Sequence, residues 1–466
     1  MKTGDIEIVS GKQLSAEDLG QCEGMIIEAD PLAGVANAQV QGINDLTLLD
    51  NAGVQRRRIA SDEHLKLLST SYKMSLRDPK IEEKLFPHLY PFGRGGFDMT
   101  LRSSSVKVVT HGQYAKIRLM HADPRWRHDK VWPFFAYDWV MKFRILMYNM
   151  KCPRIAIEND NRDLPLTKEY VLSDLGSGEK VHNKLGQYIP PTLPGIKKYW
   201  AKEYLDLAAF CERCGVPDFF VTLTANDNWP ELKKFLNGVA PHFRPVETTV
   251  LFMQRFRALK PLLWGNKSVF GRVTDHWRRI EFQNRGALHI HMLLWVDNSE
   301  SKEGKVSAVV PREVGDVNLR EMVLKYQIHS CRPGRCFKKD AKHTLCKYGF
   351  PYALLKDGLD ESGIRYNYAR FKSEEDAKAV PYNRELLKAW DGHINVQRVT
   401  QLGLVRYLVK YVSKIEPTFT MSVKQNKTEV DKYFTTRLIG APEVATTLLS
   451  FQIAGGTRQV SFLDTN

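Results

Sequence analysis

The pattern of apolar and polar residues along the chain predicts a mixture of helices and strands. Residues 219–224 are a short run of aromatic and β-branched side chains, which is typical of a buried strand. The same reasoning predicts strands at residues 269–283 and 287–295, and helices at residues 197–214 and from Trp229 onward. Helices and strands do not alternate regularly, as they would in a doubly wound fold. The pattern therefore predicts an α+β fold with an antiparallel sheet.

Two histidines make the strand at residues 287–295 the most informative one. His289 and His291 are two positions apart, so they project from the same face of a strand. If residues 284–286 form a hairpin loop, Glu281 lies opposite His289 on the same side, with Gln283 close by. Two imidazoles with a carboxylate or amide oxygen suit a divalent ion such as Mg²⁺ or Mn²⁺. We expect a catalytic metal site here; the alternative is an amphipathic hairpin with exposed histidines.

A second informative element is the helix predicted at residues 400–414. Its apolar stripe has Tyr407 and Tyr411 at one edge, one turn apart, with Lys410 and Lys414 beside them. A phenol ionises only near pH 10, so it needs nearby positive charge to act as a nucleophile. The two lysines can supply this charge and can also stabilise a phosphorane-like transition state. The alternative is a pair of tyrosines that flank an ordinary core.

Charge and composition restrict the classes of partner that we expect this chain to bind. The 466-residue chain has 68 Lys and Arg against 53 Asp and Glu, a net charge of +15, which favours a polyanion such as nucleic acid. Its 43% hydrophobic content is that of a globular protein. No apolar run approaches the roughly 20 residues that span a bilayer, and no signal peptide is evident, so no membrane partner is expected. Seven cysteines, an odd number, favour a reducing compartment over a disulfide framework.

Residues 112–150 are rich in aromatic and basic side chains. Arginines interleaved with aromatic rings can hold phosphates while the rings stack on bases. Arg125 and Arg127 are therefore candidates for DNA contacts. The aromatic residues of the segment 132–143 are better explained as the core face of a helix.

A second candidate metal site combines His329 with Cys331, Cys336 and Cys346. One imidazole and three thiolates satisfy the tetrahedral coordination of a structural Zn²⁺ ion. His343 competes with His329 for the nitrogen position. The alternative is a loop that carries free thiols.

Together these features resemble the Rep-type nuclease region of Helitron transposases, which are two-tyrosine members of the HUH endonuclease superfamily. The resemblance rests first on the histidine hairpin and on the tyrosine helix. It covers most of the chain after residue 80, with further matching motifs at residues 85–96, 123–125, 132–135, 220–231, 380–383 and 393–396.

The resemblance implies that His289 and His291 bind the catalytic metal and that Tyr407 and Tyr411 are the nucleophiles. It implies an HUH-nuclease-like central antiparallel five-stranded sheet flanked by helices, with an N-terminal accessory domain and a zinc-stabilised insertion. Helitron-like sequences carry a similar His/Cys cluster, which favours the zinc site over free thiols.

The expected domain order follows from the same resemblance. Residues 1–80 are expected to be an N-terminal extension, and residues 81–190 a helical, basic and aromatic DNA-binding region. Residues 191–415 are expected to form the HUH (Rep) endonuclease domain with the zinc-binding insertion at residues 298–352. Residues 416–466 resemble the connector to the helicase domain that Helitron proteins normally carry in the same polypeptide. We therefore expect a nuclease part that is truncated or expressed separately.

The expected function is cleavage and rejoining of single-stranded DNA at transposon ends through a 5′-phosphotyrosine intermediate. Lys410, Lys414 and Arg285 are candidates for phosphate contacts, and the resemblance to eukaryotic transposons implies a nuclear protein. One alternative is a rolling-circle replication initiator or relaxase with the same chemistry. Another is a zinc-stabilised DNA-binding module without catalysis, in which the tyrosines belong to the core.

Overall fold

A computed structural model describes the greater part of the chain. The described residues are 25–26, 78–97, 109–151, 192–193, 197–282, 287–312, 316–331, 336, 346, 348–353, 356–359, 366–370, 373–400, 438–458 and 460. The chain divides into two compact units. One unit comprises residues 1–196 with 416–451, and the other comprises residues 197–415 with 452–466.

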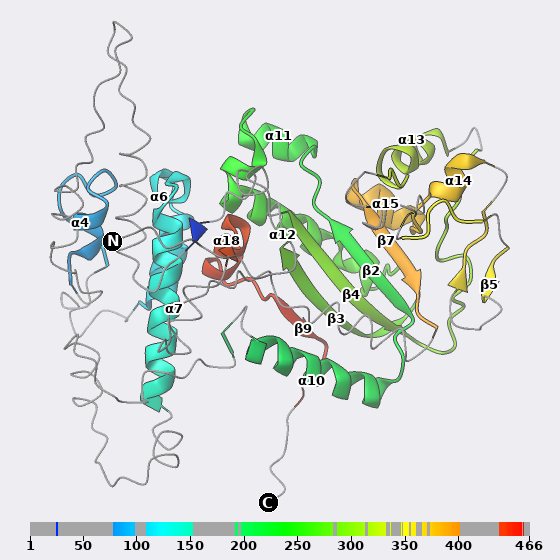
Figure 1. The fold of residues 1–466 in the computed structure, drawn as a ribbon, viewed down its shortest axis with the longest axis horizontal. Coiled ribbons are helices and arrows are strands. Elements are labelled where there is room, and N and C mark those ends of the chain that lie inside the picture. The colour runs from blue at the N-terminus through cyan, green and yellow to red at the C-terminus, as the bar shows by residue number, and fades with distance from the viewer. Residues whose placement is uncertain are drawn as a thin grey trace, which may run out of the picture. The chain divides into compact units, whose positions relative to one another are not determined.

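The second unit is built on a five-stranded sheet with the order β7-β2-β4-β3-β9. Every neighbouring pair in this sheet is antiparallel. The strands are β2 (Phe219–Thr224), β3 (Val273–Phe282), β4 (Leu288–Val296), β7 (Ile394–Arg398) and β9 (Ala454–Gly456) (Figure 1). The structure thus confirms the predicted α+β class and the antiparallel five-stranded sheet flanked by helices.

Helices cover both faces of this sheet. The helical elements of the unit are α10 (Lys197–Cys214), α11 (Pro230–Leu236), η2 (Pro241–Phe243), α12 (Pro245–Leu263), α13 (Val317–Tyr326), α14 (Glu374–Lys378) and α15 (Arg384–Trp390). A small two-stranded sheet pairs β5 (Gly358–Leu359) with β6 (Tyr366–Asn367). All nine residues of β4 are buried, as expected for a central strand that is covered on both sides.

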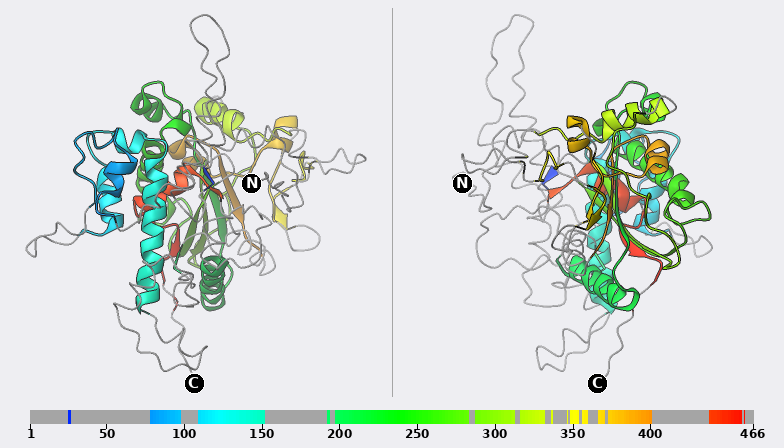
Figure 2. Two further views of the ribbon diagram at one scale, coloured as in Figure 1. Left: turned by 60° about the vertical axis from the view of Figure 1, so that its left-hand side comes forward. Right: turned by 90° about the vertical axis from the view of Figure 1, so that its right-hand side faces the viewer.

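Helix α10 lies along the sheet face that carries residues 289, 291, 293 and 295 of β4 (Figure 2). Its Trp200 and Phe210 pack into one buried cluster with Phe220 of β2 and Trp295 of β4. The helix ends where the sequence predicts, because Gly215 adopts a φ of 77°, a conformation that strains other residues.

Aromatic residues in α12 and just after it cover the opposite face of the sheet. The ring of Phe256 lies 5.5 Å from the guanidinium carbon of Arg278 on β3. Trp264, just after α12, stacks on His276 of β3 with ring centroids 3.9 Å apart and an interplanar angle of 7°. Burial is the largest of the effects that lower the pKa of His276 to about 4, and the charges of Arg278 and Lys260 add to it.

The depressed pKa of His276 predicts an acid-sensitive fold. The unfolded chain binds a proton near pH 6.5 and the folded chain only near pH 4, so stability is full above pH 6.5 and falls with decreasing pH. We expect the titration of His276 to lower the free energy of unfolding by about 2 kcal/mol between pH 7 and pH 5. His276→Phe keeps an aromatic ring and should lose this part of the pH dependence, measured by urea unfolding at both pH values. An equal pH dependence in the two proteins would contradict the assignment.

The first unit is helical. Its elements are α4 (Ile81–Leu85), α5 (His111–Leu119), α6 (Arg125–His128), α7 (Trp132–Lys151), α18 (Ala441–Leu448) and a short pairing of β1 (Met25–Ile26) with β8 (Leu438–Ile439). Helix α7 contacts both α5 and α18. Its Trp132, Phe135 and Trp139 are buried, which confirms that these aromatic residues form the core face of a helix.

Two features of the C-terminal segment were not predicted from the sequence. Residues 441–448 form a helix of the first unit, and residues 454–456 add the edge strand β9 to the sheet of the second unit. The strand has the sequence Ala-Gly-Gly, which lacks the β-branched and aromatic residues by which strands are predicted. Among the described residues, no helix has the length and apolar character needed to cross a membrane.

Candidate functional site

The register of the β3–β4 hairpin brings the predicted metal-binding residues together. Glu281 pairs with His289, and Arg279 pairs with His291. The carboxylate Oε2 of Glu281 lies 2.6 Å from Nε2 of His291, so the acid also contacts the diagonal histidine. The three side chains share the face covered by α10, as the alternation of a strand requires.

Strand β2 supplies two hydroxyl groups that fix both imidazoles from the other side. Oγ1 of Thr222 lies 3.0 Å from Nδ1 of His291, and Oγ1 of Thr224 lies 3.1 Å from Nδ1 of His289. The β2–β4 register sets these contacts, because Thr222 pairs with His291 and Thr224 pairs with His289. With each Nδ1 engaged, Nε2 is the ring nitrogen that each histidine can offer to a ligand.

The two histidines are buried, and Glu281 is half-buried. His289 and His291 are only 6% and 4% exposed, so the alternative of an exposed histidine pair is wrong. Phe220 stacks against His291 with an interplanar angle of 2°. The guanidinium of Arg279, itself 1% exposed, lies 3.6 Å from the ring centre of Trp200 on α10. This packing holds the ligand side chains in place, as a preorganised site requires.

The ionisation of Glu281 suits a role as a cation ligand. Burial alone would raise the pKa of this carboxyl, but the hydrogen bond with His291 and the charges of His291, Arg279 and His289 lower it below the usual value. The carboxylate is therefore ionised at neutral pH. Two imidazole nitrogens with one carboxylate form a donor set that fits Mn²⁺ or Mg²⁺ and leaves coordination positions open.

The threonine contacts predict a specific loss on substitution. Thr222→Val keeps the side-chain volume but removes the hydroxyl that fixes His291, and such outer contacts contribute roughly 10- to 100-fold to metal affinity. We expect Mn²⁺ affinity, measured by calorimetric titration, to fall by about this factor. Thr249→Val is the matched control, because Thr249 is also buried, on α12, and its hydroxyl has no hydrogen-bond partner among the residues that the structure describes. Equal Mn²⁺ affinity in wild type and Thr222→Val would show that the hydroxyl does not support the site.

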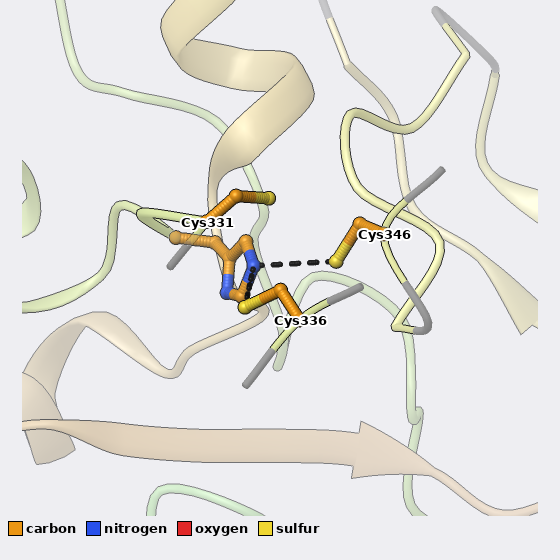
Figure 3. A group of neighbouring side chains, drawn as sticks. Cys331, Cys336 and Cys346 are labelled. Carbon is orange, nitrogen blue, oxygen red and sulfur yellow. Dashed lines mark hydrogen bonds between the residues drawn. The ribbon is translucent and has the colours of Figure 1, made fainter. Parts of the chain in front are cut away.

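The predicted zinc ligands also meet in the structure. The ligand atoms of His329, Cys331, Cys336 and Cys346 all lie within 4.8 Å of one another (Figure 3). Nε2 of His329 is 3.8 Å from Sγ of Cys336 and 3.4 Å from Sγ of Cys346. Zn–N and Zn–S bonds of ~2.0 and ~2.3 Å at a tetrahedral angle place nitrogen and sulfur ~3.5 Å apart. The cluster can therefore hold a metal ion such as Zn²⁺.

The surroundings of the cluster fix His329 and favour a thiolate. The His329 ring stacks on Phe350 with centroids 4.2 Å apart, and its backbone N–H donates to the carbonyl of Lys378. Burial opposes ionisation of Cys346, but hydrogen bonds from the backbone N–H groups of Tyr348 and Phe350 and from the Cys331 and Cys336 thiols together lower the pKa of this thiol. The spacing of the sequence left His329 and His343 as alternatives. The structure places His329 in the cluster, while His343 lies outside the described residues.

Several predicted site residues lie outside the described part of the chain. These are Gln283, Arg285, Tyr407, Lys410, Tyr411 and Lys414. Their roles stay predictions.

The two arginines predicted to contact DNA lie in the first unit, at α6. Arg125 pairs with Asp123, and Arg127 donates to the backbone carbonyl of His121 at 2.5 Å. The Arg125 side chain is still 42% exposed. A role in DNA binding remains a prediction for both.

Comparison with known families places part of the chain in a transposon context. Residues 114–294 match the family model described as a Helitron helicase-like domain at the N-terminus. The match spans α10, β2, β3 and most of β4, and thus includes the histidine cluster. It ends before the zinc cluster and the two tyrosines. No curated protein matches the chain.

Proposed function

We propose that this chain is a Helitron-type transposase nuclease that cleaves and rejoins single-stranded DNA at transposon ends. The observation that carries the proposal is the cluster of His289, His291 and Glu281, with both imidazoles fixed by threonine hydroxyls. The match of residues 114–294 to a Helitron helicase-like N-terminal domain supports the transposon context. The net charge of +15 supports a nucleic-acid substrate.

The sheet supports an HUH-type arrangement. The histidine strand β4 is the third of five strands, so it lies at the centre of the sheet. Its neighbours on both sides contribute to the site, because β2 provides the threonines and β3 provides Glu281. A site built on the middle strands of a rigid sheet holds its ligands more firmly than a site on loops does.

The three side chains would hold a divalent cation, which polarises the scissile phosphate when bound. Tyr407 or Tyr411 would then attack the phosphorus. The phenolic oxygen forms the new bond to phosphorus, the bond to the 3′ oxygen breaks, and the phenolic proton ends on the released 3′-OH. The 5′ end stays on the tyrosine until the 3′-OH of another strand attacks and reverses the reaction. Two tyrosines allow two ends to be held at once.

Three positive side chains would stabilise negative charge in this reaction. Lys410 and Lys414, one helical turn or less from the tyrosines in the predicted helix, lower the cost of forming a phenolate. Arg285, in the loop between β3 and β4, can contact the phosphate beside the histidines. These roles come from the sequence and its resemblance to the Helitron nuclease region.

The nucleophiles are tested with a labelled single-stranded oligonucleotide and Mn²⁺. The wild-type protein should give a covalent, denaturation-resistant complex, and the double variant Tyr407→Phe, Tyr411→Phe should give none. Tyr204→Phe is the control, because Tyr204 is an exposed tyrosine on α10. A covalent complex in the double variant would refute the assignment of the nucleophiles.

The same assay separates the rival functions. A rolling-circle initiator or relaxase would form the adduct on an origin sequence in preference to transposon ends. A zinc-stabilised DNA-binding module would bind DNA with a chelator present and cleave nothing. The proposal further implies that the protein resides in the nucleus and that it acts together with a helicase domain of a Helitron protein.

A further inference from the structure

A tight loop in the first unit presents one phenylalanine almost entirely to solvent. Phe92 is 81% exposed, more than any other large hydrophobic side chain in the part of the chain that the structure describes. It belongs to residues 91–96, called here the Phe92 loop, which follows the buried residues Leu89 and Tyr90. The ring is therefore accessible to a binding partner.

The Phe92 loop is fixed at its base. Gly93 and Gly95 have φ values of 59° and 102°, which favour glycine and allow the sharp reversal. The carboxylate of Glu83 accepts the N–H of Gly96 at 2.9 Å, and a guanidinium N–H of Arg118 donates to the carbonyl of Gly95. The exposed ring is thus held on a structured turn, and little conformational entropy is lost when it binds a partner.

The carboxylates below the loop are already engaged. Glu82 is buried and accepts hydrogen bonds from the Phe97 N–H and the Trp132 indole. Oε1 of Glu83 accepts the N–H of Gly96. The two carboxylates thus hold the backbone at the end of the loop, at Gly96 and Phe97.

Two positive side chains flank the exposed ring. The guanidinium carbon of Arg94 lies 5.9 Å from the centre of the Phe92 ring. Nζ of Lys80 lies 3.5 Å from the carbonyl oxygen of Gly93. Within the described residues, neither Arg94 nor Lys80 has a carboxylate partner. The loop therefore combines an exposed aromatic ring with two nearby cationic groups.

We propose that the Phe92 loop is a binding site for single-stranded DNA, separate from the histidine cluster, in which Phe92 stacks on an unpaired base. Arg94 and Lys80 contact the phosphates on either side of that base. A stacked aromatic ring beside cations suits a single strand because every base has a π-face and every linkage carries one charge. A duplex would not offer the Phe92 ring a free base face, since its bases are already stacked on one another. The choice of DNA rests on the proposed function, while the stacking chemistry does not.

The test is equilibrium binding of the full chain to a fluorescent oligo-dT in the presence of EDTA, so that cleavage does not interfere. Phe92→Ala should raise Kd about tenfold, the lower part of the range for losing one stacked base. Phe92→Trp should bind at least as tightly as wild type, and Phe92→Leu should behave like Phe92→Ala. Arg94→Ala should reduce the slope of log K against log salt by about 0.7, the value for one phosphate contact on a single strand.

Matched controls separate stacking from other effects. Leu205→Ala removes another exposed apolar side chain, on α10, and should leave Kd unchanged. Binding to a duplex of the same length should not respond to Phe92→Ala. An unchanged Kd for Phe92→Ala would overturn the proposal, as would full binding by Phe92→Leu. An equal loss on the duplex would point to a nonspecific role of the loop and would also overturn it.

Failure of this inference can be told apart from failure of the proposed nuclease function. The Tyr407→Phe, Tyr411→Phe variant should show the same dependence of DNA binding on Phe92 as the wild type does. If the wild type forms no covalent adduct but binding still depends on the Phe92 ring, the nuclease proposal fails and the loop site stands. If the adduct forms and the ring has no effect, the loop site alone fails.

Discussion

Replacing His291 with alanine is expected to reduce DNA cleavage by roughly a thousandfold, since a bound cation contributes several kcal/mol to such a reaction. His291 has a neighbour at each ring nitrogen and another at its ring face. It faces the Thr222 hydroxyl through Nδ1, the Glu281 carboxylate through Nε2, and the Phe220 ring through its face. The substitution removes a proposed metal ligand and also takes away the imidazole that contacts the half-buried Glu281 carboxylate.

Initial rates of oligonucleotide cleavage at saturating Mn²⁺ measure this effect. His276→Phe is the matched control, because His276 is a partly buried histidine of β3 outside the cluster, and its variant should cleave at the wild-type rate at pH 7.5. Circular dichroism distinguishes lost chemistry from lost folding. A folded His291→Ala protein that cleaves within tenfold of wild type would show that the histidine pair is not catalytic.

Replacing Cys331 with serine is expected to weaken zinc binding by the His/Cys cluster and to destabilise the region around it. Cys331 is exposed, whereas Cys336 and Cys346 are buried, so its substitution removes a ligand and no packing. Structural zinc contributes about 10–16 kcal/mol of apparent binding free energy in zinc-finger peptides, and a site with one ligand fewer keeps only part of it. We expect a loss of unfolding free energy of about 3 kcal/mol or more for the segment that the zinc holds.

Two measurements on the same preparations test this prediction. Elemental analysis after dialysis against a weak chelator should find one zinc per wild-type chain and less in Cys331→Ser. Amide hydrogen exchange should find faster exchange in residues 316–350 of the variant. Cys214→Ser is the control, because Cys214 is a partly exposed thiol at the end of α10 outside the cluster. Equal zinc content in Cys331→Ser and wild type would contradict the assigned ligand set.

The parts of the candidate site that the sequence predicts correctly are local in the chain. Glu281 and His289 are eight residues apart across one turn, so the strand period and the loop length fix their pairing without reference to the rest of the fold. The four residues of the His/Cys cluster lie within a span from residue 329 to residue 346, and their chemistry alone makes them a candidate metal site.

The threonines could not be predicted in the same way. Thr222 and Thr224 precede the histidines by 69 and 65 residues, and their role depends on the register between β2 and β4. The alternation of threonine in residues 219–224 gives only a weak signal, because threonine is common in strands for its β-branched shape alone. The position of β9 could not be predicted from the sequence for a related reason. Its Ala-Gly-Gly sequence gains its place by pairing with β3, through backbone hydrogen bonds that any sequence can form.

The choice between His329 and His343 shows the limit of spacing rules. Either histidine would complete a four-ligand site with the three cysteine thiolates, so the number of ligands does not distinguish them. The structure brings His329 into the cluster because it follows α13 directly and its N–H is bound by the carbonyl of Lys378. This contact joins segments about fifty residues apart, and no local pattern encodes it.

The most direct test of the central claim is pulsed electron paramagnetic resonance on the zinc-loaded protein with one equivalent of Mn²⁺. If His289 and His291 hold the catalytic cation, the spectrum should contain the couplings of two coordinated imidazole nitrogens, and both should vanish in the His289→Ala, His291→Ala variant. The account is contradicted if Mn²⁺ binds without nitrogen couplings, or if the couplings persist in that variant.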